Sequence, residues 1–340
     1  MKVVTFGELM MRLTPPGYQR LIQTKSLEIT FGGAEANVAV SLACMGDQAA
    51  FVSKLPADDL SQAALNSLRQ WGVETDYILR GGSRMGVYYL ERGASQRPSK
   101  VVYDRAGSAI AQAKAEEFDW DRIFADADWF HLTGITPALS AELADACEAA
   151  CMTAKKKGLT VSFDPNYRAK LWTVAQAAEA MKRYLPYVDV LITNENQAAD
   201  LSGVHVPACE ISGDDVTDQG YLALAKQLKE RYPNLGYIAL TERRTFSAED
   251  NSFCAKLFDG EKLYSSAKYR IDIVDRVGGG DAFAAGLIFA LRRGQSTQDA
   301  VRFAAAASCL KHSVEGDFNP ATVAEVNALA KGNANGRVQR

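Results

Sequence analysis

The 340-residue sequence has little excess charge of either sign and few of the residues that build metal or disulfide sites. Its formal net charge is −3, so it lacks the basic surface that binds nucleic acid. It holds only three histidines and six scattered cysteines: Cys44, Cys147, Cys151, Cys209, Cys254 and Cys309. We therefore expect reduced thiols in a cytoplasmic protein, with no disulfide framework and no cysteine-histidine metal site.

The chain also has no apolar run as long as a membrane span, no internal repeat and no G-x-G-x-x-G sequence. The first absence argues against a membrane protein, and the last against a dinucleotide-dependent dehydrogenase. With 47% hydrophobic and 23% charged residues, the composition is that of a soluble globular protein with a large core. We expect partners that are small molecules rather than nucleic acid or membrane.

What the sequence does contain is a regular alternation of strand and helix patterns. Strands are expected at 2–6, 49–53, 77–79, 128–132, 160–163, 188–192 and 237–240. Helices are expected at 34–43, 59–71, 140–157, 174–185, 218–230, 281–292, 297–311 and 321–330. This rhythm predicts an α/β fold with a doubly wound, mainly parallel sheet flanked by helices. Polar clusters that follow several of these strands predict a site at the carboxyl ends of the sheet.

Two segments interrupt the alternation with antiparallel β patterns. They predict a small β lid, formed by residues 10–31 and 86–105, that projects from the main domain. The α/β nucleotide- and substrate-binding domain is then made of residues 1–9, 32–85 and 106–340. Because a two-part lid sheet exposes edges and apolar faces, we also expect a homo-oligomer.

The most informative stretch is DRVGGGDAF at residues 275–283, between a β-rich segment and an apolar helical run. Three consecutive glycines leave backbone N–H groups uncovered, and a helix start adds partial positive charge, so the junction suits a phosphate. Asp281 lies beside this anion site. It is either a cap of the helix or a base that takes a proton from a hydroxyl attacking a phosphoryl group.

This stretch resembles the C-terminal signature of the ribokinase-like (PfkB) family of sugar kinases, and the G-G-x-x-x-N-x-A pattern at 32–39 resembles its N-terminal signature. The resemblance runs from residue 2 to about residue 320. It implies an ATP-dependent kinase in which Asp281 is the general base. The backbone amides of Gly278, Gly279 and Gly280 would form an anion hole, with Mg²⁺ bridging the ATP phosphates.

Three further motifs resemble the 2-keto-3-deoxygluconate kinases within that family. They are Y-x-R-x-x-S-A at 103–109, G-I-T-P-A-L-S at 134–140 and D-x-N-Y-R at 164–168. By this resemblance a sugar-acid pocket is lined by Gly33, Tyr88, Tyr103, Arg105, Ile135 and Arg168. The two arginines are expected at the carboxylate end, because guanidinium groups grip carboxylates in bidentate fashion.

The same resemblance implies that the nucleotide is contacted by Asn194, Thr241, Gly278 and Gly280. Two segments depart from the family pattern near these residues. Residues 194–197 read N-E-N-Q where relatives often have N-x-x-E, and residues 241–244 read T-E-R-R where relatives usually have a glycine-rich turn. Arg276 also replaces a threonine that is common in the C-terminal signature.

The resemblance predicts phosphorylation of the terminal hydroxyl of 2-keto-3-deoxygluconate to give 2-keto-3-deoxy-6-phosphogluconate. A fructokinase or a 2-deoxy-5-ketogluconate kinase is the alternative within the same class, and a need for Arg105 and Arg168 distinguishes the candidates. A non-catalytic sugar-acid or nucleotide sensor is a third hypothesis. The intact glycine-aspartate stretch argues against it, because a sensor has no use for the base.

Overall fold

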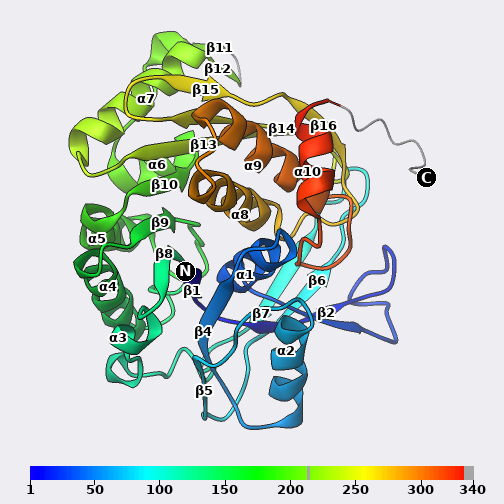
Figure 1. The fold of residues 1–340 in the computed structure, drawn as a ribbon. Helices are drawn as coiled ribbons and strands as arrows, with labels where there is room; N and C mark the ends of the chain where they lie inside the picture. The colour runs from blue at the N-terminus through cyan, green and yellow to red at the C-terminus, as the bar shows by residue number, and fades with distance from the viewer. Residues whose placement is uncertain (213–214, 333–340) are drawn as a thin grey trace.

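A central ten-stranded sheet runs through the molecule, with helices on both faces (Figure 1). The computed structural model describes residues 1–212 and 215–332, so residues 333–340 of the predicted α/β domain lie outside the described residues. The strands of this sheet are β1 (Lys2–Phe6), β4 (Ala49–Leu55), β5 (Ile78–Arg80), β8 (Ala127–Thr133), β9 (Thr160–Asp164), β10 (Val190–Thr193), β13 (Tyr237–Thr245), β14 (Asp250–Phe258), β15 (Leu263–Ser265) and β16 (Tyr269–Asp272).

The strand order is β15-β14-β13-β10-β9-β8-β1-β4-β5, and β16 also pairs with β14. Every pairing from β5 across to β13 is parallel, whereas β14 pairs antiparallel with β13, β15 and β16. The crossovers between parallel strands are made by helices, as parallel strands require. The predicted doubly wound α/β fold is confirmed.

The helices divide between the two faces of this sheet. They are α1 (Ala34–Cys44), α2 (Asp59–Arg69), α3 (Trp120–Ile123), α4 (Ala141–Lys156), α5 (Val174–Tyr184), α6 (Glu195–Ser202), α7 (Asp218–Arg231), α8 (Gly279–Arg292), α9 (Thr297–Lys311) and α10 (Val323–Ala330). One apolar core lies beneath α1, α2, α8 and α9, and a second lies beneath α3 to α7. Successive strand residues such as Val3 and Val4 enter opposite cores, because side chains alternate across a strand.

Short connections complete the described chain. Three 3₁₀ turns lie at Ala115–Glu117, Leu185–Tyr187 and Ala208–Glu210, and β11 (Ile211–Ser212) pairs with β12 (Asp215–Val216). Among the described residues, no helix combines the length and the apolar character that crossing a lipid bilayer demands.

A separate four-stranded sheet is built from the two segments that interrupt the βα alternation, seen as the blue and cyan strands of Figure 1. We call it the lid sheet. Its order is β3 (Glu28–Gly32), β2 (Met10–Thr14), β6 (Val87–Glu91) and β7 (Lys100–Asp104). The β2–β6 pairing is parallel and the other two are antiparallel.

Several predicted strand boundaries differ from the structure by one or two residues, and the largest difference is at the end of β13. The strand expected to end at residue 240 continues to Thr245, so residues 241–244 lie within β13 and pair with β14 rather than forming a turn after the strand. Its apolar pattern stops at Leu240, because beyond that point the strand leaves the helix-covered core. Strand prediction from sequence relies on a periodic pattern of apolar residues, so a strand segment made of polar residues is missed.

Candidate active site

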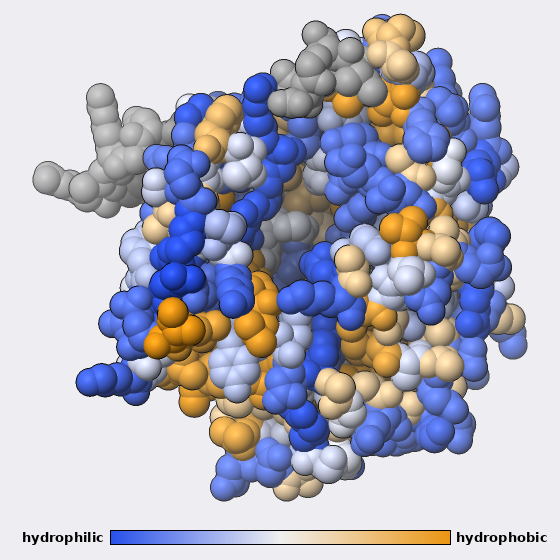
Figure 2. Space-filling model, turned by 180° about the vertical axis from the view of Figure 1, so that it is seen from behind, coloured by the Kyte–Doolittle hydropathy of each residue, from blue (hydrophilic) through white to orange (hydrophobic). Residues whose placement is uncertain are grey.

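A cavity of about 520 Å³ opens beyond the carboxyl ends of the central parallel strands, where ligands bind in doubly wound sheets. The face of the molecule drawn in Figure 2 is hollowed near its centre, with hydrophilic residues prominent around the hollow. Every residue assigned to a site from the sequence lines this single cavity: Gly33, Tyr88, Tyr103, Arg105, Ile135, Arg168, Asn194, Thr241, Gly278, Gly279, Gly280 and Asp281.

The glycine stretch forms the start of α8. Gly278 precedes the helix at φ 85°, a left-handed conformation that favours glycine, and a Cβ there would lie 2.1 Å from the carbonyl oxygen of Asp317. A Cβ on Gly279 would lie 2.3 Å from the ring of His312. Both positions therefore demand glycine. The amide groups of the first helical turn have no acceptor within the helix, which leaves them for an anion.

Asp281 is held from the other end of the chain. Asn37 on α1 donates its Nδ2 hydrogen to Oδ2 of Asp281 at 2.7 Å, and its Oδ1 accepts from the amide of Gly33 at 3.2 Å. Gly278, not Asp281, occupies the capping position of α8. The side chain that the sequence allowed as either a cap or a base is thus a cavity-facing carboxyl group oriented by the N-terminal glycine motif.

Burial raises the pKa of Asp281 to about 7, with nearby Asp164 and Asp317 acting in the same direction and the Asn37 hydrogen bond opposing it. Burial also raises the pKa of Asp164, which lines the same cavity, to about 6. A carboxyl group whose pKa lies near neutrality is well matched to accept a proton in a reaction at physiological pH.

The two arginines expected at the substrate end differ in their surroundings. Arg168 is exposed, and among the described residues its guanidinium group donates only to the backbone carbonyls of Asn166 and Tyr167, at 3.3 and 3.1 Å. Arg105 is buried and forms an ion pair with Glu8, its Nε lying 2.8 Å from Oε2. Arg168 is therefore the group with charge to spare for a ligand carboxylate.

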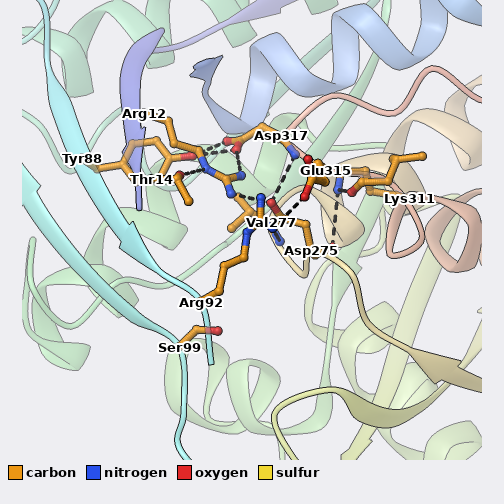
Figure 3. A network of polar contacts seen from close by, with 12 residues as sticks. Arg12, Thr14, Tyr88, Arg92, Ser99, Asp275, Val277, Lys311, Glu315 and Asp317 are labelled. Carbon is orange, nitrogen blue, oxygen red and sulfur yellow. Dashed lines mark hydrogen bonds and ion pairs between the residues drawn. The ribbon is translucent and has the colours of Figure 1, made fainter. Parts of the chain in front are cut away.

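Tyr88 lines the cavity with its ring, but its hydroxyl is already engaged. It donates to the carboxylate of Asp317 at 2.6 Å, and Asp317 in turn accepts from Nη1 of Arg12 at 2.7 Å. Arg12 also pairs with Asp275 and donates from Nε to Thr14 at 2.9 Å. This network, drawn in Figure 3, joins strands β2 and β6 of the lid sheet to the loop that leads into the glycine stretch.

Two of the residues predicted to contact the nucleotide, Asn194 and Thr241, lie at the start of a helix and within a strand, respectively. Asn194 caps α6 by accepting the amide hydrogen of Gln197 at 2.9 Å, and Thr241 donates to the carbonyl oxygen of Thr193 at 3.3 Å. Beside them, Glu195 has a buried Oε2 with no hydrogen-bond partner among the described residues. Within residues 1–212 and 215–332, no three His, Cys, Asp or Glu side chains cluster as a ready-made metal site.

Residues 1–323 match the sequence profile of the pfkB family of carbohydrate kinases. This chain belongs to that family. The 2-dehydro-3-deoxygalactonokinase of Haloferax volcanii is 36% identical over 331 residues, which is 97% of each chain. The crystal structure of 2-dehydro-3-deoxygluconokinase from Thermotoga maritima matches at 49% identity with a TM-score of 0.93, over 98% of each chain. The 2-dehydro-3-deoxygluconokinase of Bacillus subtilis is 28% identical over 93% of this chain and 91% of its own.

This PfkB-family kinase is thus a phosphotransferase with an alcohol group as acceptor. Its structure adds cavity residues that were not assigned to the site from the sequence. Glu8 belongs to one of the polar clusters that follow the predicted strands, after the strand at 2–6, and Asn37 was noted only as a letter of the N-terminal motif. Arg243 and Arg276 were noted only as departures from the family pattern, because nothing local to them shows that they line the same cavity.

The pKa of Asp281 predicts the pH dependence of this kinase. A general base at Asp281, the role that the family resemblance implies, would work deprotonated, so kcat/KM should fall as the pH drops through about 7, with Asp164 titrating in the same range. In Asn37→Ala the hydrogen bond that lowers the pKa of Asp281 is lost, so the acid limb should move to higher pH. A pH profile of kcat/KM for both proteins measures this, and superimposable acid limbs would contradict it.

Proposed function

We propose that this kinase transfers the γ-phosphoryl group of ATP to the terminal hydroxyl of 2-keto-3-deoxygluconate, giving 2-keto-3-deoxy-6-phosphogluconate. The observation that carries the proposal is Arg168, a guanidinium with no carboxylate partner among the described residues, in the same cavity as Asp281 and the glycine anion site. Relatives named for 2-dehydro-3-deoxy sugar acids support an acidic substrate. An acid with its carboxylate on Arg168 presents its far end to the base.

In this mechanism Asp281 accepts the proton of the terminal hydroxyl as that oxygen bonds to the γ-phosphorus. The bond from phosphorus to the β–γ bridging oxygen breaks, and ADP leaves. The backbone amides of Gly278 to Gly280 donate to the phosphoryl oxygens, where charge is greatest in the transition state. The lid sheet contributes Met10, Tyr88 and Tyr103 to the cavity wall, and these side chains help to exclude water.

Mg²⁺ bound with ATP would supply positive charge that neutralises the phosphate groups. The group in this chain that fits the ion is Glu195, whose buried Oε2 is without a partner among the described residues and which lines the cavity. Burial raises the pKa of this carboxyl group, and an adjacent cation would favour its charged form. In this proposal the acidic residue that holds the ion is the second residue of the N-E-N-Q segment at 194–197, whereas relatives often have a glutamate at the fourth position.

A coupled ADP-release assay tests the substrate, with ATP, Mg²⁺ and either 2-keto-3-deoxygluconate, its galactonate epimer, fructose or ribose. Arg168→Gln should raise KM for the sugar acid about tenfold to a hundredfold, the worth of a hydrogen bond between charged groups. Arg168→Gln should not change any turnover of fructose, which is neutral. The control variant is Arg20→Gln, which should leave KM for the sugar acid unchanged because Arg20 is exposed and lies outside the cavity.

Other outcomes of this assay are equally informative. If fructose is turned over faster than the sugar acid, and Arg168→Gln does not change fructose turnover, the protein is a kinase but 2-keto-3-deoxygluconate is not its substrate. Binding of ATP and sugar acid without turnover of any sugar would favour the sensor. The homo-oligomer, the cytoplasmic location and the action of the lid sheet as a lid stay predictions. Light scattering on the purified chain measures the first of these.

A further inference from the structure

Two arginines outside the assigned site lie at the nucleotide end of the cavity. Arg243 comes from β13 and Arg276 from the loop before α8, and both line the cavity that holds Gly278 to Gly280. Unlike Arg105, neither forms an ion pair with a carboxylate among the described residues. Arg243 is exposed and Arg276 half-buried. Their charges are therefore accessible from the cavity, and no carboxylate within residues 1–212 and 215–332 forms an ion pair with either of them.

Arg243 is held in place by His312 and Phe253. Its Nη2 lies 3.0 Å from Nε2 of His312, and its Cζ lies 5.9 Å from the centre of the Phe253 ring. The Nδ1 atom of His312 lies 2.6 Å from the carbonyl oxygen of Ser308. Because that oxygen can only accept, Nδ1 carries the proton and Nε2 accepts from Arg243. Burial lowers the pKa of His312 to about 3, so the imidazole stays neutral.

The same imidazole supports the glycine anion site. Its ring fills the space where a Cβ of Gly279 would be, and Ser308 donates from Oγ to the carbonyl oxygen of Gly279 at 2.8 Å. The carbonyl oxygen of His312 accepts from the amide of Val274 at 2.8 Å. His312 therefore contacts Arg243 on one side and the glycine stretch on the other. This fixes the guanidinium relative to the amide donors.

The two guanidinium groups lie close enough to affect each other. Protein atoms around the Arg243 guanidinium group and the charge of Arg276 lower the pKa of Arg243 to about 10, while other parts of the Arg243 side chain are exposed. Burial lowers the pKa of Arg276. Both stay protonated at neutral pH. Two like charges held together without an acid cost free energy, and an anion bound between them would offset that cost.

The direction of β13 indicates which anion Arg243 and Arg276 would bind. Thr241 and Arg243 are two residues apart on β13, so they share a face of the strand, and both line the cavity. The phosphoryl group in transfer must lie at Asp281 and the glycine amides, with the sugar acid toward Arg168. Groups on the β13 side therefore meet the phosphate that departs with the nucleotide.

We propose that Arg243 and Arg276 bind the β-phosphate of the nucleotide, with His312 as the positioning residue of Arg243. This inference rests on the proposed kinase function. As the β–γ bridging bond breaks, negative charge grows on the departing phosphate, and the two guanidinium groups stabilise it. A side-chain donor on β13, Arg243, then stands in the segment where relatives usually have a glycine-rich turn.

Calorimetric binding of ADP and AMP, without sugar, tests the proposal. Arg243→Gln and Arg276→Gln should each weaken ADP binding about tenfold to a hundredfold. They should leave AMP binding close to that of the wild type, because AMP has no β-phosphate. The matched control is Arg244→Gln, whose side chain does not line the cavity and which should bind both nucleotides as the wild type does. Unchanged ADP binding, or equal losses for ADP and AMP, would overturn the proposal.

His312→Phe separates positioning from mere support. Phenylalanine keeps a ring beneath Gly279 but offers no acceptor to Arg243, so ADP binding should fall as in Arg243→Gln. The double variant, with both His312→Phe and Arg243→Gln, should bind ADP no more weakly than the single variant that has the lower ADP affinity. Additive losses, or a parallel loss of AMP binding, would overturn the role of His312. If the wild type phosphorylates the sugar acid and neither Arg243→Gln nor Arg276→Gln changes the affinity for ADP, only this inference fails. If it phosphorylates no sugar, the proposed function fails, whatever the ADP measurements show.

Discussion

The Asp281→Asn protein is expected to bind the sugar acid and ATP but to turn over about 10²- to 10⁴-fold more slowly, the usual loss when a general base is removed. Asparagine has nearly the shape of aspartate and can still meet the amide of Asn37, so the fold and the cavity should persist. What it lacks is a lone pair basic enough to take the hydroxyl proton. The loss should therefore appear in kcat, with the calorimetric affinities for both substrates close to those of the wild type.

Asp164→Asn is the informative comparison for this result. Asp164 is the other carboxyl group of raised pKa in the cavity, and its Oδ1 accepts the amide hydrogen of Asn166 at 2.8 Å. If Asp281 is the base, Asp164→Asn should reduce kcat far less than Asp281→Asn. The reverse order of the two losses would assign the base to Asp164 and contradict the mechanism.

The largest loss of stability is expected for Arg12→Met, about 3 to 5 kcal/mol in the free energy of unfolding. The Arg12 side chain is 1% exposed and faces Asp275 and Asp317, which are themselves buried. Methionine fills much of the same volume but leaves two buried carboxylates without their shared cation. Urea unfolding at neutral pH, followed by circular dichroism, measures the difference.

Arg20→Met is the matched control for that experiment. Arg20 lies 3.5 Å from Glu91 but its side chain is 53% exposed, and exposed ion pairs contribute at most about 1 kcal/mol. Similar unfolding free energies for Arg12→Met and Arg20→Met would show that the buried network does not hold the lid sheet.

The central sheet was readable from the sequence because its strands and helices carry strong, unbroken apolar patterns. The place of the glycine-aspartate stretch at a helix start in the cavity was predictable for a different reason, since the stretch is contiguous in sequence; its role as an anion site stays a prediction. Residues 241–244 illustrate the limit of both signals. They belong to β13, yet their alternating side chains reach a cavity or solvent instead of a core, so no apolar period marks them.

Contacts between distant residues could not be read in the same way. Arg105 and Arg168 look alike in sequence, each beside a tyrosine in a polar loop, but only Arg105 meets Glu8 in the structure. Asn37 and Asp281 are 244 residues apart and become partners only when α1 and α8 pack together. Charge pairing of this kind depends on where whole elements lie, which local patterns do not contain.

The span of the Arg12–Asp317 pair has a consequence for biosynthesis. The two residues are 305 positions apart, and a ribosome that adds about 5 to 20 residues per second needs about 15 to 60 s to cover that distance. Strand β2 lacks both carboxylate partners of Arg12 until residue 275 is made, and it lacks one of them until residue 317 is made. A nascent chain that stops before residue 317 would lack the carboxylate that Arg12 and Tyr88 share and one residue of the cavity wall. Because the cavity is incomplete until then, the kinase can begin to consume ATP only when its synthesis is almost finished.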